Sequence, residues 1–181
     1  MEDGLNRLHV GGRQVKAGWK ILNIQPGVGV DYVGDIRDLS QFSDGTFDVV
    51  YGSHVLEHIS QNEMVSTLAG LNRILTPNGE LWISVPDLEV LSRLFIDPNL
   101  DKAARFHVMR MMFGGQTDPF DFHYIGLTYE FLMDYFGQAG FEWAQRVHEF
   151  GVFDDTSSFA PYGVLISLNV IAHKSPMPKS E

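Results

Sequence analysis

Apolar and polar residues along the chain form two kinds of segment, short apolar runs and longer stretches with helical spacing. The clearest runs are Asp48–Tyr51 and Glu80–Val85, which are rich in valine, isoleucine and aromatic residues and predict strands. Between them, apolar positions at helical spacing from Met64 to Leu75 predict one helix, opened by a capping box over Ser60–Glu63. The turn residues Thr76–Gly79 lead into the second strand. A strand, a helix and a strand with short joins predict a parallel crossover.

The same two patterns recur along the rest of the chain. Helices are predicted after Asp87, Asp101 and Thr128, whose side chains can accept hydrogen bonds from the first turn of a helix. Alternating strands and helices predict a three-layer α/β sheet, and the last two strands, joined without a helix, predict an antiparallel edge. The further predicted strands are Leu8–Val10, Trp19–Gln25, Asp31–Ile36, Phe141–Phe150 and Gly163–His173.

The length and composition are those of one globular domain. The chain has 181 residues, enough for one buried core and short for two ordinary domains. We therefore predict a single domain over residues 1–174 and a disordered tail over 175–181. No segment approaches the roughly 20 apolar residues that cross a bilayer. The first residues are acidic where a signal peptide is basic, so we expect a cytoplasmic protein with no membrane partner.

The net charge of the chain limits the kinds of partner that we expect. The formal net charge is −10, with 13 lysines and arginines against 23 acidic residues, and the basic residues form no run. Nucleic-acid backbones are bound mainly by clustered lysine and arginine, so we expect no nucleic-acid partner and favour a small acceptor molecule. The chain has no cysteine, which excludes disulfides, thiolate metal sites and cysteine nucleophiles.

Two segments lack any periodic pattern. Gly114–Gly126 is long, holds three aromatic residues with a histidine and two aspartates, and lies between predicted helices. Phe153–Ser158 is a second segment of this kind. Long irregular loops in small domains are often functional. Both loops could overhang the carboxyl ends of the strands, where open α/β sheets bind ligands.

Two segments of the chain carry a family resemblance. Phe47–Ile59 reads FDVVYGSHVLEHI, and Leu71–Asp87 reads LNRILTPNGELWISVPD. This order resembles the middle of class I S-adenosylmethionine-dependent methyltransferases, where a strand is followed by an "hVLEHi" run and then by an "LkPGGxLxIxxP" strand. The resemblance implies a Rossmann-like methyltransferase fold, here shortened at its N-terminal side, with S-adenosylmethionine as the cofactor.

The first cofactor motif of that family is a glycine-rich turn after the first strand. Here Val10, Gly11 and Gly12 stand at its position, and the resemblance assigns them to the methionine end of the cofactor. The family's third glycine is missing, and the segment that follows is too short for a packed helix. A branch associated with polysaccharide biosynthesis has a similar short form, "LNLGCGxxxxxGWxNxD", which Gly18–Trp19 and Asn23 fit.

The other cofactor contacts implied by the resemblance follow the next strands. An acidic residue usually ends the second strand and binds the ribose, but here Gln25 takes that place, with Asn23 as the alternative. An amide oxygen accepts weaker hydrogen bonds than a carboxylate. Asp35 and Ile36 stand where the family contacts adenine, and Asp35 could alternatively only cap the turn. Ser53 would face the methionine portion, or be a plain small residue at a strand end.

Catalysis has no single strong motif in this sequence. Methyl transfer to oxygen or nitrogen requires positioning of the two substrates and often one general base. We predict that His54, at a strand end, or His123, on the long loop, serves as that base.

The run His54–His58 also satisfies H-x-x-E-H, the inverted signature of zinc proteases. Two histidines at this spacing share a helix face, and zinc would need a further ligand. Because the run directly follows an α/β-type strand, we favour the methyltransferase interpretation and expect no metal. His58 is then a buried, hydrogen-bonded histidine at the start of a helix.

The sequence therefore predicts transfer of a methyl group from S-adenosylmethionine to a small acceptor. The resemblance to the shortened branch implies a sugar or a polysaccharide precursor. The alternative is a non-catalytic, methyltransferase-like module that binds a partner or another ligand, which the missing acidic residue and the short glycine turn favour. A homo-oligomer is left open by the sequence.

Overall fold

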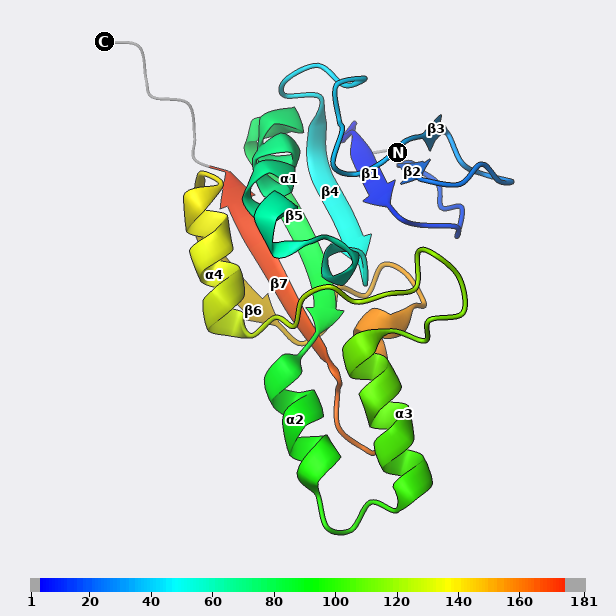
Figure 1. Ribbon diagram of the computed structural model, residues 1–181. Coiled ribbons are helices and arrows are strands. Elements are labelled where there is room, and N and C mark those ends of the chain that lie inside the picture. Colours follow the sequence, from blue (N-terminus) through cyan, green and yellow to red (C-terminus); the bar gives the residue numbers. More distant parts are fainter. Residues whose placement is uncertain (1–3, 175–181) are drawn as a thin grey trace.

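Seven strands form one twisted sheet at the centre of the molecule (Figure 1). The structure is a computed structural model and describes residues 4–174. The strand order is β3-β2-β1-β4-β5-β7-β6. The strands are β1 Arg7–Val10, β2 Trp19–Asn23, β3 Tyr32–Val33, β4 Phe47–Ser53, β5 Leu75–Pro86, β6 Phe141–Val147 and β7 Ser167–Lys174.

The strand directions confirm the predicted mixed α/β fold. Strands β1 to β5 pair in parallel with one another, and helix α1 (Gln61–Ile74) connects β4 to β5 as the predicted crossover. Strand β7 is antiparallel to both β5 and β6. The final pair is thus antiparallel, with β6 at the edge of the sheet and β7 one position inside it.

Three of the predicted helix starts are confirmed by their hydrogen bonds. The side chain of Asp87 accepts from two backbone N–H groups of α2, and Asp101 and Thr128 each accept from one at the start of α3 and α4. The remaining helices are α2 Leu88–Ile96, α3 Lys102–Phe113 and α4 Tyr129–Gln138, with two short 3-10 helices, η1 Leu56–His58 and η2 Thr156–Ser158.

Two local predictions between β4 and β5 are corrected. At the start of α1, the Ser60 hydroxyl donates to the Glu63 carboxylate at 2.7 Å and makes no bond to the helix backbone, so the expected capping box does not form. The residues 76–79 do not separate the helix from the strand. They lie inside β5 as an irregularity, because Phe47 pairs with Leu75 and Val49 already pairs with Glu80.

The main hydrophobic core lies between the sheet and two helices. Helices α1 and α4 cover one face of the sheet, as Figure 1 shows. Fully buried side chains of α1, including Met64, Leu68 and Leu71, pack against strand residues such as Val50. Helices α2 and α3 form a hairpin beyond the carboxyl ends of the strands, with a small core of their own. The carboxyl ends of β1, β2 and β4 are left accessible beside this hairpin.

The opposite face of the sheet is covered by aromatic side chains from a loop. Phe153 stacks on Tyr51 with ring centroids 5.2 Å apart and lies 4.1 Å from the ring of His9. Phe150 stacks on Trp82 at 5.8 Å. The third layer of the fold is therefore formed by a loop with η2 and not by long helices, and it anchors to the sheet where the Tyr51 hydroxyl donates to Asp155 at 2.7 Å.

Among the described residues, no helix is long and apolar enough to cross a membrane. The predicted tail at 175–181 lies outside the described residues.

Candidate functional site

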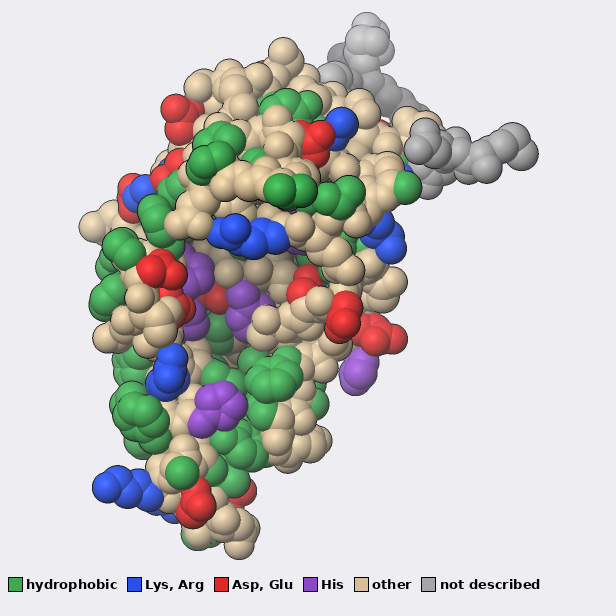
Figure 2. Space-filling view, turned by 90° about the vertical axis from the view of Figure 1, so that its right-hand side faces the viewer, with side chains coloured by type: hydrophobic (Ala, Val, Ile, Leu, Met, Phe, Trp, Pro, Cys, Tyr) green, Lys and Arg blue, Asp and Glu red, His purple; other side chains and the backbone are tan. Residues whose placement is uncertain are grey.

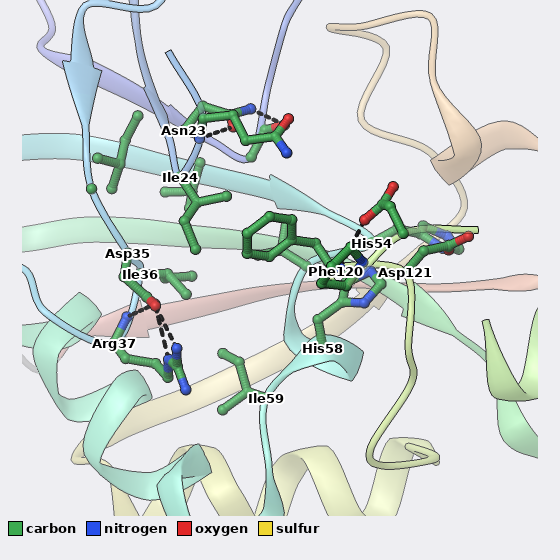
Figure 3. A pocket seen from close by; sticks show the side chains of 18 of the residues that line it. Asn23, Ile24, Asp35, Ile36, Arg37, His54, His58, Ile59, Phe120 and Asp121 are labelled. Atoms are coloured by element: carbon green, nitrogen blue, oxygen red, sulfur yellow. Dashed lines mark hydrogen bonds and ion pairs between the residues drawn. The ribbon is translucent and has the colours of Figure 1, made fainter. Parts of the chain in front are cut away.

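A cavity opens at the carboxyl ends of β1, β2 and β4, where the parallel strands point. Its volume is about 490 Å³. Figure 2 shows the hollow on this side of the molecule, with histidine and acidic side chains gathered inside it. The lining residues lie at the ends of the four strands β1, β2, β3 and β4 and on the long loop before α4 (Figure 3). The lining residues used below are Val10, Gly11, Arg13, Asn23, Ile24, Gln25, Asp35, Ile36, Arg37, His54, Val55, His58, Asp118, Phe120, Asp121 and Tyr124.

The glycine turn after β1 is held by Asn23. The Asn23 amide nitrogen donates to the carbonyls of Gly11 and Gly12 at 3.1 and 3.0 Å, and its oxygen accepts from the Gln25 backbone N–H at 2.9 Å. Gly11 has a φ of +74°, and a Cβ there would meet the Val55 side chain at 2.6 Å. Glycine is therefore required for the turn and for its close approach to the segment after β4.

Gln25 contacts a cation at the edge of the cavity. The Arg13 guanidinium donates to the Gln25 amide oxygen at 2.6 Å. Since this acceptor is neutral, the positive charge of Arg13 stays uncompensated by Gln25. Asn23 differs from Gln25, because its amide already bonds within the loop. Of the two residues predicted for the ribose, Gln25 is the one with capacity for a ligand.

Asp35 lies at the far end of the cavity and is paired with Arg37 (Figure 3). The Arg37 guanidinium donates to both Asp35 oxygens, with Nη2 at 2.6 Å from Oδ2 and Nε at 3.0 Å from Oδ1. These hydrogen bonds hold the pKa of the Asp35 carboxyl below its usual range. Asp35 also accepts from the Arg37 backbone N–H at 2.9 Å, so it caps the turn as expected, and its predicted contact with adenine stays a prediction.

Two predicted cofactor residues do not line the cavity. Ser53 is the last residue of β4, and its hydroxyl is buried behind the cavity wall. Gly12 faces the His9 ring on the opposite side of the turn, and that ring would collide with any Cβ at this position. Neither residue carries a side chain toward the cavity, and their predicted contacts with a cofactor stay predictions.

His54 lines the cavity and has an unusual backbone. Its φ is +54°, a conformation that non-glycine residues rarely adopt, and it turns the chain out of β4 immediately after Ser53. The His54 Nε2 lies 2.9 Å from the Ser167 hydroxyl, and its Nδ1 lies 3.2 Å from Oε1 of Glu57. Strained residues of this kind are concentrated at functional sites.

Glu57 is a buried carboxylate beside three histidines. It is 1% exposed, and His54, His58 and His123 all act on it. Burial raises the pKa of the Glu57 carboxyl, but the three histidines more than offset this and lower it overall. His123 is mostly buried behind the cavity, with Nε2 4.0 Å from Oε1 of Glu57, and burial lowers its pKa.

The loop before α4 forms the outer wall of the cavity. Phe120 projects its ring between Ile24 and the histidines in Figure 3. Tyr124 is fixed to the strand side, because its backbone N–H donates to the Glu57 carbonyl at 2.8 Å. The predicted overhang is thus confirmed for Gly114–Gly126. No residue of Phe153–Ser158 lines this cavity: Phe153 packs on the opposite face of the sheet against His9, and the Thr156 carbonyl accepts from the Ser167 hydroxyl at 2.8 Å.

Several lining residues were not singled out by the sequence. Arg13 and Arg37 adjoin predicted contacts, but nothing in their spacing shows which of the 13 basic residues turns inward. Glu57 lies inside the recognised run, yet the pattern does not show that it is buried. Phe120 and Tyr124 belong to the loop that the sequence marked as irregular. Its aromatic content was the one signal that could have indicated that they line a ligand site.

The sequence comparisons agree with the fold. Residues 13–83 match the profile of a methyltransferase domain family, which is less than half of the chain. No curated protein sequence matches the chain. The profile match indicates a methyltransferase domain over these residues, and the structural similarities below show the fold.

Solved structures similar to this chain share its fold at low sequence identity. A SAM-dependent methyltransferase from Archaeoglobus fulgidus is 15% identical with a TM-score of 0.59, covering 94% of this chain and 87% of that one. The 1,6-didemethyltoxoflavin-N1-methyltransferase from Burkholderia thailandensis, solved with its substrate and S-adenosylhomocysteine, is 17% identical with a TM-score of 0.58, covering 93% and 70%. A possible exported protein from Bordetella parapertussis is 11% identical with a TM-score of 0.57, covering 93% and 61%. The chain spans only 49% to 61% of the length of three such proteins.

Proposed function

We propose that this protein binds S-adenosylmethionine in the cavity beside the strand ends and transfers its methyl group to a small acceptor. One observation carries the proposal. Gly11, Asp35 and His54 come from three separate family-like motifs, and they line a single cavity. The cavity volume of about 490 Å³ lies within the range of small-molecule sites, roughly 300–1,000 Å³.

The polar groups of the cavity fit the nucleoside half of the cofactor. Asp35 and Ile36 would hold the adenine at one end, where the Arg37 pair keeps the carboxylate ionised and fixed. Gln25 would accept from the ribose. Asn23 would act indirectly, because its bonds to the glycine turn set the position of that turn.

The amino-acid half of the cofactor carries a carboxylate and needs a cation. Arg37 is already neutralised by Asp35, whereas Arg13 donates to the neutral side chain of Gln25. Arg13 is therefore the arginine of the cavity with charge available for this carboxylate. Arginine suits the role, because its planar group can bind a carboxylate through two parallel hydrogen bonds.

The acceptor would lie at the histidine end of the cavity. When bound, S-adenosylmethionine supplies a methyl group on a positively charged sulfur. The acceptor atom attacks the methyl carbon in line with the carbon–sulfur bond, and the sulfur leaves. The chain has to position the two molecules and to take up the acceptor's proton. Of the two predicted bases, His54 is the better placed, since it lines the cavity and His123 lies behind it.

A sugar or a polysaccharide precursor is the acceptor class we favour. The support is the short glycine turn with Gly18–Trp19 and Asn23, which resembles the polysaccharide-associated branch. The net charge of −10 disfavours nucleic acid as the acceptor. The cytoplasmic location, the lack of a membrane partner and the oligomeric state stay predictions.

Methyl transfer can be tested with a deuterated methyl donor. The protein is incubated with CD3-labelled S-adenosylmethionine and a panel of monosaccharides and nucleotide sugars, and the products are analysed by mass spectrometry. We expect one CD3 group on an acceptor and equimolar S-adenosylhomocysteine. His54→Ala should lower the rate about 10²–10⁴-fold if it acts as the base, and the exposed His148→Ala should leave it unchanged.

A second function is favoured by one observation at the ribose position. The chain after β2 offers the amide of Gln25 where the family has a carboxylate, and that amide is already bonded to Arg13. The alternative is a methyltransferase-like module that binds a ligand without turnover. Saturable binding of S-adenosylhomocysteine with no transfer to any acceptor would favour this alternative.

A further inference from the structure

Four side chains with metal-binding capacity meet at the inner end of the cavity, and we call them the His–Glu cluster: His54, Glu57, His58 and His123. Ligand atoms of Glu57, His58 and His123 all lie within 4.8 Å of one another. Three members lie at or just before the short helix η1, and His123 is brought in by the loop before α4. The cluster thus joins two segments that are far apart in the sequence.

The carboxylate of Glu57 lacks the partners that a buried charge requires. It is 1% exposed, and neither of its oxygens has a hydrogen-bond partner among the described residues. The His54 Nδ1 lies 3.2 Å from Oε1, within ion-pair distance but outside hydrogen-bond geometry. A buried carboxylate without hydrogen bonds is costly unless a cation compensates it.

The ring of His58 is oriented as in a metal ligand. Its Nδ1 lies 3.1 Å from the Phe122 carbonyl oxygen. A carbonyl can only accept, so Nδ1 carries the proton and Nε2 keeps a free lone pair. Histidines that bind metals commonly donate their other ring N–H to a backbone carbonyl in this way, which fixes the tautomer.

His123 supplies the ligand that the sequence pattern alone did not provide. Its Nε2 lies 4.0 Å from Oε1 of Glu57, too far for a hydrogen bond. Two ligand atoms of one tetrahedral ion with bonds of about 2.1 Å lie about 3.4 Å apart. The His123 Nε2 and the Glu57 Oε1 would therefore have to approach each other only slightly to bind one ion. Its ring also packs edge-on against His58 with centroids 4.9 Å apart.

We propose that Glu57, His58 and His123 bind a divalent transition-metal ion at the inner wall of the cavity. Two imidazoles and one carboxylate suit zinc and its neighbours in the first transition series, and they do not suit magnesium or calcium, which prefer oxygen ligands. His54 also contacts the Glu57 carboxylate, with Nδ1 3.2 Å from Oε1, and its Nε2 lies 2.9 Å from the Ser167 hydroxyl. This assignment replaces the sequence-based expectation of no metal and makes His123 a ligand.

The location gives the ion a role that rests on the proposed methyl transfer. His58 lines the cavity, so an ion held by it would adjoin the acceptor end. A metal ion there would bind an acceptor oxygen and make its hydroxyl more acidic. In the transfer, the hydroxyl proton would pass to His54, the base of the proposed function, the oxygen would form a bond to the methyl carbon, and the methyl–sulfur bond would break with its electron pair going to sulfur.

Metal binding can be measured without any cofactor or acceptor. The purified full chain, stripped with a chelator, is titrated with Co²⁺ and, separately, with Zn²⁺. We expect one ion per chain and visible absorption bands for Co²⁺ in a histidine–carboxylate site. His123→Gln should weaken binding at least about 100-fold, because a lost ligand costs no less than a lost supporting contact. The exposed His148→Gln is the matched control and should bind as the wild type does.

His58→Gln is the second variant, because His58 is only half-buried and its loss is tolerated more easily by the fold than the loss of His123. It should show the same weakening. The proposal is overturned if the wild type binds no ion saturably, or if His58→Gln binds as tightly as His148→Gln. S-adenosylhomocysteine binding by the metal-free protein is measured in parallel. A chain that binds this ligand but no metal would refute the metal site and leave the proposed function standing.

Discussion

His9 is a buried histidine that the fold keeps uncharged. Its side chain is covered by Phe153 and Tyr51, and burial lowers its pKa to about 4, although Asp155 nearby acts in the opposite direction. Below pH 6.5 the unfolded chain takes up a proton that the folded chain excludes. The contribution of neutral His9 to stability is therefore present above pH 6.5 and is lost as the pH falls toward 4.

This gives a pH-dependent prediction for His9→Phe, which keeps the aromatic packing and removes the titration. Between pH 7 and pH 4.5 the wild type should lose about 2–3 kcal/mol more unfolding free energy than the variant. Urea unfolding of both proteins at the two pH values measures the difference. Equal losses in the two proteins would show that His9 is not kept neutral.

Arg13 carries a second prediction at this scale. If its charge binds the cofactor carboxylate, Arg13→Gln should weaken S-adenosylhomocysteine binding about 10-fold, since a hydrogen-bonded charge contributes about 1.5–3 kcal/mol when paired. Lys102→Gln makes the same change of net charge at the start of α3, away from the cavity, and serves as the control. Calorimetric titration measures both. Identical affinities for the two variants would remove Arg13 from the site.

Most of the site residues that a family motif named lie at one cavity, and their contacts with a cofactor stay predictions. Val10, Gly11, Asn23, Gln25, Asp35, Ile36 and His54 all line the cavity. Ser53 does not, because it lies two positions after Tyr51 in β4 and its side chain is on the same face of the sheet as that of Tyr51. The position of His123 beside Glu57 depends on a loop whose path follows from tertiary packing, so spacing could not reveal it.

At the scale of elements, Asp87 combines two stabilising contacts. Its side chain caps α2 through two backbone N–H groups and accepts from Arg146 Nη2 at 2.8 Å, while being 1% exposed. Its loss therefore removes a cap and leaves the half-exposed Arg146 without this partner. Asp101 is exposed, and its side chain makes the capping hydrogen bond of α3 without a second contact, among the described residues, of the kind that Asp87 makes with Arg146.

We expect Asp87→Ala to lower the free energy of unfolding by about 2–4 kcal/mol. Asp101→Ala should lower it by about 1 kcal/mol, the usual cost of an N-cap. Urea unfolding of the two variants measures both values. A cost for Asp87→Ala no larger than that for Asp101→Ala would show that the contact with Arg146 adds nothing.

Helix starts and the central crossover could be predicted because they depend on residues close in sequence. The caps at Asp87, Asp101 and Thr128 each act within three positions. The cover on the second face of the sheet could not be predicted in this way. It depends on contacts such as that between Tyr51 and Asp155, which are 104 positions apart.

At the scale of the whole molecule, the sheet presents two different faces and one functional edge. Helices α1 and α4 build the core on one side, and aromatic side chains close the other. The parallel strands β1, β2, β3 and β4 end together, which brings the glycine turn, the Asp35–Arg37 pair and the histidines His54 and His58 to a single cavity. This agrees with the general rule that open α/β sheets bind ligands beyond the carboxyl ends of their strands.

The central claim is that this cavity binds S-adenosylmethionine, and calorimetric titration of the full chain with S-adenosylhomocysteine tests it most directly. We predict saturable binding of one ligand per chain with a dissociation constant of about 1–100 µM, corresponding to about −8 to −5.5 kcal/mol. Adenosine, which lacks the carboxylate expected to contact Arg13, should bind more weakly. The absence of saturable binding at about 1 mM ligand would contradict the account.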